Sequence, residues 1–193
     1  DDGLSDHYHY VFPELIKRGL WGIFYISSKP YLDKNFLGVH LIHNLIGSIS
    51  ANILLKQLES LEIEGMIPDA LKPDFVEETY QNQKNPPSID KFKRIMNYFI
   101  DYKFREKIIL DLIKLNKLTN DLDSFYLTLD QIKEMNAKGM MFGSHSVNHL
   151  LLSKLNYSQQ RFEIIESLGF IEQLLGKNQL KTFCFPYGGS RSY

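Results

Sequence analysis

The sequence predicts an α/β fold of the barrel type, in which parallel strands alternate with helices. Two short apolar runs, residues 21–27 and 140–143, have the length and the residue types of buried strands. A third run of this kind covers residues 181–185. Helical patterns separate the runs, and strands that alternate with helices in this rhythm predict a parallel sheet wrapped by helices.

A short helix is predicted before the first strand. Residues 5–18 can form it, with Pro13 tolerated only in the first turn and Gly19 as the C-terminal cap. Its predicted inward side chains are Tyr10, Val11, Leu15 and Ile16.

Two more helices flank the second strand. Thr128 and Gln131 have the spacing of a capping box, so a helix should begin there and stop at Gly139. Ser158 is expected to start the next helix, which should close at Gly176. The predicted inward side chains of that helix are Phe162, Ile165, Leu168, Ile171 and Leu175.

The segment 33–125 differs from the rest because its patterns are mostly helical. Leucine and isoleucine recur at helical spacing over residues 36–62, with a break near Gly47–Ser48. A proline-containing loop follows, and two further helices are predicted for about residues 89–99 and 101–116.

The composition is that of a globular protein with one hydrophobic core. The chain has 193 residues, 44% of them hydrophobic and 13% aromatic, and a formal net charge of −1. This charge gives no basic surface of the kind that nucleic-acid-binding proteins use. The single cysteine, Cys184, excludes an internal disulfide, and no apolar run is long enough for a membrane span. The cell envelope and the cytoplasm both stay open as locations.

Two histidines follow the strand 140–143. On a helical turn, His145 and His149 would lie on the same face, so both imidazoles could reach one ion. Two imidazole nitrogens and a carboxylate are a common set of ligands for zinc and for non-haem-iron-type metals. The alternative is a pair of histidines with ordinary hydrogen bonds, because the spacing alone is not specific.

Two other motifs accompany the histidines. The chain opens with Asp1-Asp2-Gly3, and the strand-like run near its end stops in the turn Pro186-Tyr187-Gly188. All three motifs fall at the C-terminal ends of predicted strands, which is where parallel α/β barrel enzymes build their active sites.

In this order, the three motifs resemble those of the polysaccharide deacetylases, the NodB-homology family of carbohydrate esterases. That family carries an Asp-Asp-Gly motif, a His-Ser/Thr-x-x-His motif and an aromatic-x-x-Pro-Tyr-Gly motif. The resemblance covers residues 127–188 and the first thirty residues. It implies a distorted (β/α) barrel that is incomplete in this chain, because the later family motifs, with the histidine that protonates the leaving amine, would lie beyond residue 193.

The resemblance also bears on domain organisation. We interpret residues 1–193 as a single deacetylase-like domain, with the segment 33–125 as a mostly helical insertion between the first and second motifs. A lid or a substrate-gripping element is the alternative for this segment.

The resemblance implies a role for each motif residue. Many relatives have an arginine in the third motif that orients the base, whereas this chain has Cys184 and Phe185 in that region. The implied roles are Asp1 as the base, Asp2, His145 and His149 as ligands of a divalent metal, Tyr187 as the backbone donor to the oxyanion, and Pro186 with Tyr187 as substrate contacts.

The predicted function is that of a metal-dependent hydrolase, with zinc as the first choice of metal. It would remove N-acetyl or O-acetyl groups from a polysaccharide or oligosaccharide, by attack of a metal-activated water. Two alternatives stay open: a non-catalytic carbohydrate-binding relative, and a hydrolase of small amides on the same scaffold.

Four further histidines lie outside the motifs. His7 and His9 closely follow the acid pair, so one of them could reach the cleft. For His40 and His43, three residues apart in an apolar helix, ordinary packing or surface placement is expected.

Overall fold

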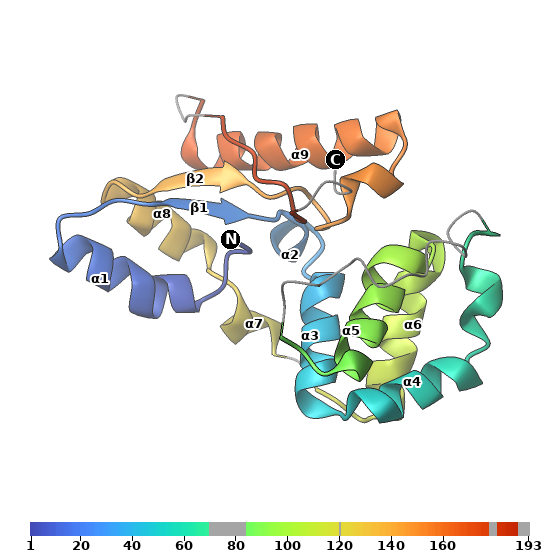
Figure 1. The fold of residues 1–193 in the computed structure, drawn as a ribbon. Helices are drawn as coiled ribbons and strands as arrows, with labels where there is room; N and C mark the ends of the chain where they lie inside the picture. Colours follow the sequence, from blue (N-terminus) through green and yellow to red (C-terminus); the bar gives the residue numbers. More distant parts are fainter. Residues whose placement is uncertain (70–83, 120, 178–180, 189–193) are drawn as a thin grey trace. The chain divides into compact units, whose positions relative to one another are not determined.

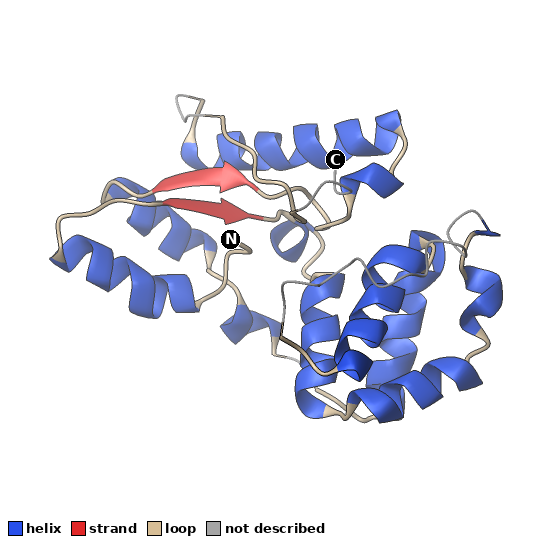
Figure 2. Ribbon diagram, viewed as in Figure 1, coloured by secondary structure: helices blue, strands red, loops and turns tan. Residues whose placement is uncertain are grey.

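Residues 1–37 and 121–193 form one unit of the chain, and residues 38–120 form a second. We call them unit 1 and unit 2. Both are drawn in Figure 1, and Figure 2 shows that helices make up most of their secondary structure. The computed structural model describes residues 1–69, 84–119, 121–177 and 181–188.

Unit 1 is built on two strands, β1 (Ile23–Ile26) and β2 (Met141–Ser144), which run parallel. Phe24 lies opposite Phe142 in this register, and the two rings stack with their centroids 5.7 Å apart. Both side chains belong to the buried core of the unit. The parallel pairing that the sequence predicted is therefore confirmed for these two strands.

A third extended segment lies along the other edge of β2. The backbone N–H of Ser144 donates to the carbonyl of Thr182, and its carbonyl accepts from the N–H of Cys184, both at 2.9 Å. Phe183 forms an isolated parallel bridge with Ser144 rather than a full strand. A barrel of this class closes with about eight strands. The described residues supply three parallel segments, so a barrel is not shown among them, whereas the sequence predicted a distorted and incomplete one.

Helices cover both faces of the strands. The long helix α9 (Tyr157–Leu175) packs on one face, while α8 (Leu129–Ala137) and α1 (Phe12–Lys17) lie on the other (Figure 1). The shorter elements of unit 1 are η1 (His7–Val11), α2 (Lys29–Leu32), α7 (Leu122–Phe125) and η5 (Leu152–Lys154). The buried core consists of Phe12, Phe24, Ile26, Leu127, Ile132, Met135, Met140, Phe142 and Ile171.

The first helix begins as a π-helix, η1, before it continues as α1. A π-helix has a wider turn than an α-helix, so it changes which side chains face the core. Phe12 is buried and Leu15 packs against the core, but the other side chains predicted to face inward do not. The predicted inward residues that are exposed instead are Tyr10, Val11 and Ile16.

Capping boxes start both long helices of unit 1. The predicted box of Thr128 and Gln131 is confirmed at the start of α8. At the start of α9, Asn156 is the N-cap and exchanges hydrogen bonds with Gln159, so the helix begins one residue before the predicted Ser158.

The buried face of α9 differs from the predicted one. Its fully buried side chains are Glu163, Ser167 and Ile171, which recur at helical spacing. Phe162 and Ile165, predicted to face inward, are 52% and 48% exposed. The prediction was wrong for these two because the buried face carries polar groups that bond to neighbouring segments, and hydrophobicity alone does not reveal such a face. Of the other predicted inward residues, Ile171 is buried, and Leu168 and Leu175 are half-buried.

Unit 2 is helical. Its main helices pack around apolar side chains such as Leu45, Leu54, Phe92 and Leu112. The predicted break near Gly47–Ser48 falls just after Ser48, between the first two of these helices. The elements are α3 (Gly38–Ser48), α4 (Ala51–Ser60), η2 (Ile63–Met66), α5 (Pro87–Arg94), η4 (Ile95–Phe99) and α6 (Tyr102–Leu115).

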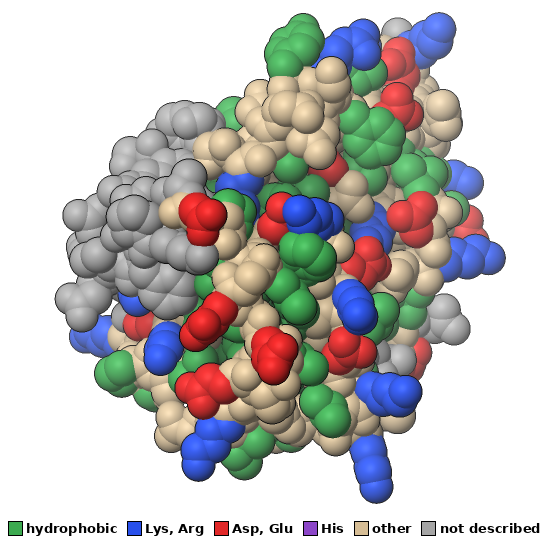
Figure 3. Space-filling view, turned by 90° about the vertical axis from the view of Figure 1, so that its right-hand side faces the viewer, with side chains coloured by type: hydrophobic (Ala, Val, Ile, Leu, Met, Phe, Trp, Pro, Cys, Tyr) green, Lys and Arg blue, Asp and Glu red, His purple; other side chains and the backbone are tan. Residues whose placement is uncertain are grey.

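The surface is mixed in charge on the face that Figure 3 presents, where acidic and basic side chains alternate with hydrophobic ones. Among the described residues, no single helix has both the length and the apolar character to cross a membrane. Helices α3 and α4 would meet those criteria only as a pair, and they are bent by 118° relative to each other.

Glycine at position 143 is required by the packing of β2. A Cβ atom there would fall well inside van der Waals contact with Thr182 Oγ1 and with the ring of Tyr25. We expect Gly143→Ala to lower the free energy of unfolding by about 1–3 kcal/mol, measured by chemical denaturation. Gly169→Ala is the matched control, because no atom lies within 4 Å of the added Cβ in α9. It should raise stability by about 0.5–1 kcal/mol, and equal effects of the two substitutions would contradict this packing.

Candidate metal centre

The first residues of the chain are fixed against two other segments of unit 1. Ser5 N–H donates to the carbonyl of Phe125 at 2.9 Å, and the carbonyl of Gly3 accepts from Leu127 N–H at 2.8 Å. Gly3 has a φ of +70°, and a Cβ there would lie 2.9 Å from Cγ2 of Ile26. Only glycine therefore allows this turn to pack closely against Ile26 at the end of β1. The turn places Asp2 at that strand end.

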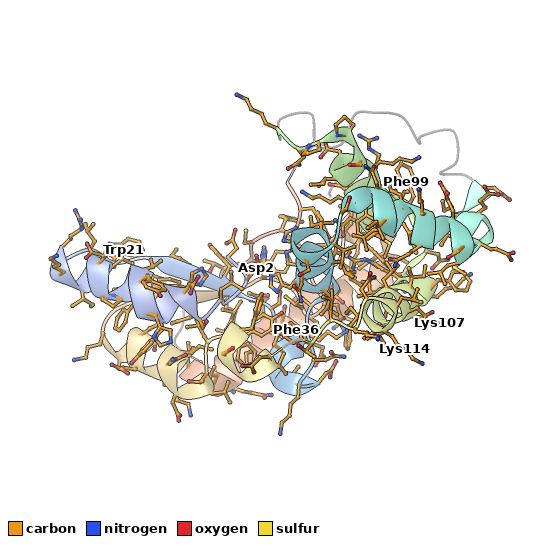
Figure 4. The ribbon with its side chains drawn as sticks, turned by 90° about the horizontal axis from the view of Figure 1, so that it is seen from below. Asp2, Trp21, Phe36, Phe99, Lys107 and Lys114 are labelled. Carbon is orange, nitrogen blue, oxygen red and sulfur yellow. The ribbon has the colours of Figure 1, made fainter. Side chains whose placement is uncertain are left out.

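Asp2 thus lies at the C-terminal end of β1. Figure 4 shows it well separated from Trp21, which precedes the strand. Its side chain is 27% exposed, and its φ of +73° is unusual for a residue with a Cβ.

The loop that carries the two histidines leaves the end of β2. His145 N–H donates to the carbonyl of Ile26 at 2.9 Å, which continues the pairing of the strands by one bond. The expected helical turn is wrong: Ser146 and His149 have φ values of +67° and +54°. The Ser146 hydroxyl accepts from His149 N–H at 3.0 Å and closes the loop. This irregular loop, rather than helical periodicity, brings the two rings to a centroid distance of 4.9 Å.

The end of β1 holds one side of this loop. The Ser27 hydroxyl donates to the carbonyl of His145 at 2.8 Å in a buried hydrogen bond. Ser28 N–H and Lys29 N–H donate to the next two carbonyls of the loop, at 3.2 and 3.0 Å. The carbonyl side of the loop is therefore bonded to the segment 27–29.

Glu163 of α9 holds the opposite side. Its Oε2 accepts from the N–H of Val147 at 2.9 Å and from that of Asn148 at 2.8 Å. Its Oε1 accepts from the side-chain amide of Asn148 at 2.6 Å. The sequence reasoning missed this residue. The available signal was its helical spacing to Ser167 and Ile171, which places a carboxylate on a face that is otherwise buried.

Three donor atoms converge between the strand ends. Asp2 Oδ1 lies 3.5 Å from His145 Nε2 and 3.2 Å from His149 Nε2, and all three donor atoms lie within 4.8 Å of one another. Ligands bound at about 2.0–2.1 Å around a tetrahedral zinc ion are about 3.3 Å apart. The spacing and the chemistry of these donors therefore fit a divalent metal ion.

The state of His145 supports the same interpretation. Burial, with a smaller contribution from the neighbouring His149, lowers the pKa of His145 from 6.5 to about 4. The ring is therefore neutral at neutral pH, and its Nδ1 lies 2.9 Å from the carbonyl of Cys184, an acceptor. Because Nδ1 must carry the proton to donate there, Nε2 presents a lone pair toward Asp2. A lone pair facing a carboxylate oxygen is favourable when a cation lies between them.

The remaining predicted residues lie around these three donor groups. Asp1 is exposed, and a carboxylate oxygen, a His145 nitrogen and Cys184 Sγ lie within 4.8 Å of one another. Burial raises the pKa of the Cys184 thiol. The Tyr187 ring meets the His149 ring edge-on, with centroids 5.2 Å apart. Pro186, the residue before it, is half-buried in the turn.

The other histidines lie outside this cluster. The His7 ring packs against Phe24 of the core at a centroid distance of 5.4 Å, and His9 is exposed. In unit 2, His40 is buried in α3 and His43 is exposed. Among the described residues, none of these four belongs to a group of side chains that could hold a metal ion.

Comparison with known proteins agrees with the motifs. The family model described as polysaccharide deacetylase matches residues 100–193, a range that contains both histidines and the Tyr187 turn. The match supports an assignment to the polysaccharide deacetylase family over this part of the chain. No curated protein and no solved structure matches the chain.

The resemblance that the motifs indicated is thereby confirmed over residues 100–193. At the level of the family, the match supports a carbohydrate deacetylase, a hydrolase that acts on acetyl-amide or acetyl-ester bonds. Deacetylases of this family usually depend on a metal.

The low pKa of His145 predicts a pH dependence of stability in the metal-free protein. In the unfolded chain this imidazole binds a proton near pH 6.5, whereas in the folded chain it does so only near pH 4. The unfolded state binds more protons in that interval, so stability falls as pH drops from 6.5 toward 4, by roughly 3 kcal/mol. The measurement is chemical denaturation at several pH values with a chelator present. His145→Gln should lack this part of the slope, and equal slopes for the two proteins would contradict the low pKa.

Proposed function

We propose that this chain is a metal-dependent deacetylase that removes N-acetyl groups, or less readily O-acetyl groups, from a polysaccharide or oligosaccharide. The observation that carries the proposal is the convergence of Asp2, His145 and His149 at the C-terminal edge of a parallel sheet. The family match supports a carbohydrate as the substrate class.

Asp2, His145 and His149 would hold the metal, with zinc as the first choice. When bound, such an ion polarises an acyl oxygen and lowers the pKa of a coordinated water. The residues of the chain contribute by orientation. The Cys184 carbonyl fixes the tautomer of His145, and the Ser146 hydroxyl fixes the backbone at His149.

Asp1 is proposed to be the base. Its carboxylate is exposed yet lies next to His145, so a substrate and a water could approach it from solvent. It would take the proton of the attacking water, a role for which a carboxylate needs only hydrogen-bond reach.

Tyr187 is proposed to stabilise the oxyanion through its backbone N–H. The contact of its ring with His149 would keep this turn in position beside the ligands. Pro186, with its restricted φ, would limit the movement of the same turn and contact the substrate together with Tyr187.

Unit 2 is proposed to be an insertion into a single domain of residues 1–193. The chain leaves unit 1 after residue 37 and returns at residue 121. Within unit 1, Leu37 N–H donates to the hydroxyl of Tyr126 at 3.1 Å, so the exit and the return lie close together. A short linker in place of residues 38–120 should therefore leave unit 1 folded and able to bind metal. A circular dichroism spectrum typical of an unfolded chain, measured on the shortened protein, would count against an insertion.

The function is tested by acetate release from acetylated chitooligosaccharides. We expect activity that a chelator abolishes and that a divalent metal restores. Asp2→Ala and His145→Ala should lose the bound metal and the activity together, measured by metal analysis and by acetate release. Asp1→Asn should keep the metal while turnover falls about 10²–10⁴-fold.

His9→Ala is the matched control, since His9 is an exposed histidine of the same unit. It should retain both metal and activity. Glycan binding without acetate release would instead favour a non-catalytic relative, and activity that survives Asp2→Ala would refute the assigned roles.

A further inference from the structure

The carboxylate of Glu163 is buried beneath the loop that joins the two histidines. Its residue is 2% exposed, and its oxygens accept three hydrogen bonds, at 2.6, 2.8 and 2.9 Å, all from Val147 and Asn148. Burial of a carboxylate is costly unless hydrogen bonds replace those of water. Here the loop supplies all three donors, and hydrogen bonds to a charged acceptor are the stronger kind.

The loop is bonded on both of its sides. Its carbonyls at Ser146 and Val147 accept from the backbone of the segment 27–29, and its N–H groups at Val147 and Asn148 donate to Glu163. The left-handed residues Ser146 and His149 bracket this stretch and take it out of regular pairing. The loop N–H groups therefore need an acceptor from elsewhere in the fold, and α9 provides it.

We infer that Glu163 is a positioning residue of the metal centre, which sets metal affinity by fixing the loop between the two ligand histidines. The inference rests on the proposed function of the same site. It goes beyond that proposal because Glu163 is not one of the residues assigned to the metal or the substrate, and acts through its hydrogen bonds to Val147 and Asn148.

Metal affinity is sensitive to such a support. Ligand distances in metal sites hold to about 0.2 Å, and His149 directly follows the two residues that Glu163 binds. Groups that orient ligands in this indirect way typically contribute 10–100-fold to metal affinity. A single carboxylate that binds two successive N–H groups fixes both the position and the tilt of the peptide between them.

The test compares Glu163→Gln with Glu166→Gln, which makes the same change on an exposed residue of the same helix. Asn148→Ala removes one of the three hydrogen bonds and leaves the sequence of α9 unchanged.

The dissociation constants of Zn²⁺ and Co²⁺ are measured by chelator competition well below the melting temperature of each variant, together with the visible spectrum of the Co²⁺-loaded protein. We expect metal binding about 10–100-fold weaker and an altered Co²⁺ spectrum for Glu163→Gln. Asn148→Ala should show a smaller loss in the same direction, and Glu166→Gln should match the wild type.

The outcomes separate this inference from the proposed function. A wild-type chain that binds no metal would overturn both. A wild type that binds metal, beside a Glu163→Gln variant with the same affinity and the same Co²⁺ spectrum, would overturn the inference alone, even if the variant melted at a lower temperature. Should Glu163→Gln fail to fold, an unchanged affinity of Asn148→Ala would overturn it in the same way.

Discussion

The segments around the site share one constraint, which is that they must hold one carboxylate and two imidazoles close together at the edge of a short parallel sheet. Asp2 Oδ1 stands 3.2–3.5 Å from two imidazole nitrogens, and burial keeps the His145 ring neutral. Groups of this kind do not attract one another strongly without a cation between them. The surrounding contacts must therefore hold them in place, and the hydrogen bonds from β1, α9 and the third extended segment do so.

Backbone strain gathers at the same place. Six non-glycine residues among those described have positive φ, and three of them, Asp2, Ser146 and His149, belong to this site. Such conformations cost of order 1–3 kcal/mol each and persist where the surroundings over-determine them. At His149 the surroundings are the Ser146 hydroxyl and the Glu163 clamp on the preceding residues. This unfavourable conformational free energy arises in the loop whose shape decides where the two imidazoles point. A functional reason for the strained backbone is therefore favoured.

The sequence predicts the strands, the Thr128 capping box and the family well, because period, turn residues and motif order are local signals. It does not predict the histidine loop. A spacing of four residues between two histidines is compatible with a helical turn and also with a loop that contains two left-handed residues, so the spacing does not distinguish the two. The prediction of the buried face of α9 fails for a related reason. Glu163 is buried although it is charged, because Val147 and Asn148 of another segment donate hydrogen bonds to it. Barrel closure depends on strands pairing at long range, and no local pattern in the described residues decides that.

The third motif contributes to the site largely through its backbone. The N–H of Cys184 bonds to Ser144, and its carbonyl accepts from the His145 ring. Neither bond involves the Cys184 side chain, so a different residue at this position could keep the same main-chain geometry. The chain can therefore lack an arginine in this region and still bring Asp2, His145 and His149 together. What changes is the neighbourhood of Asp1, where a neutral thiol stands and the proposed base must work beside His145 without a cationic side chain from this motif.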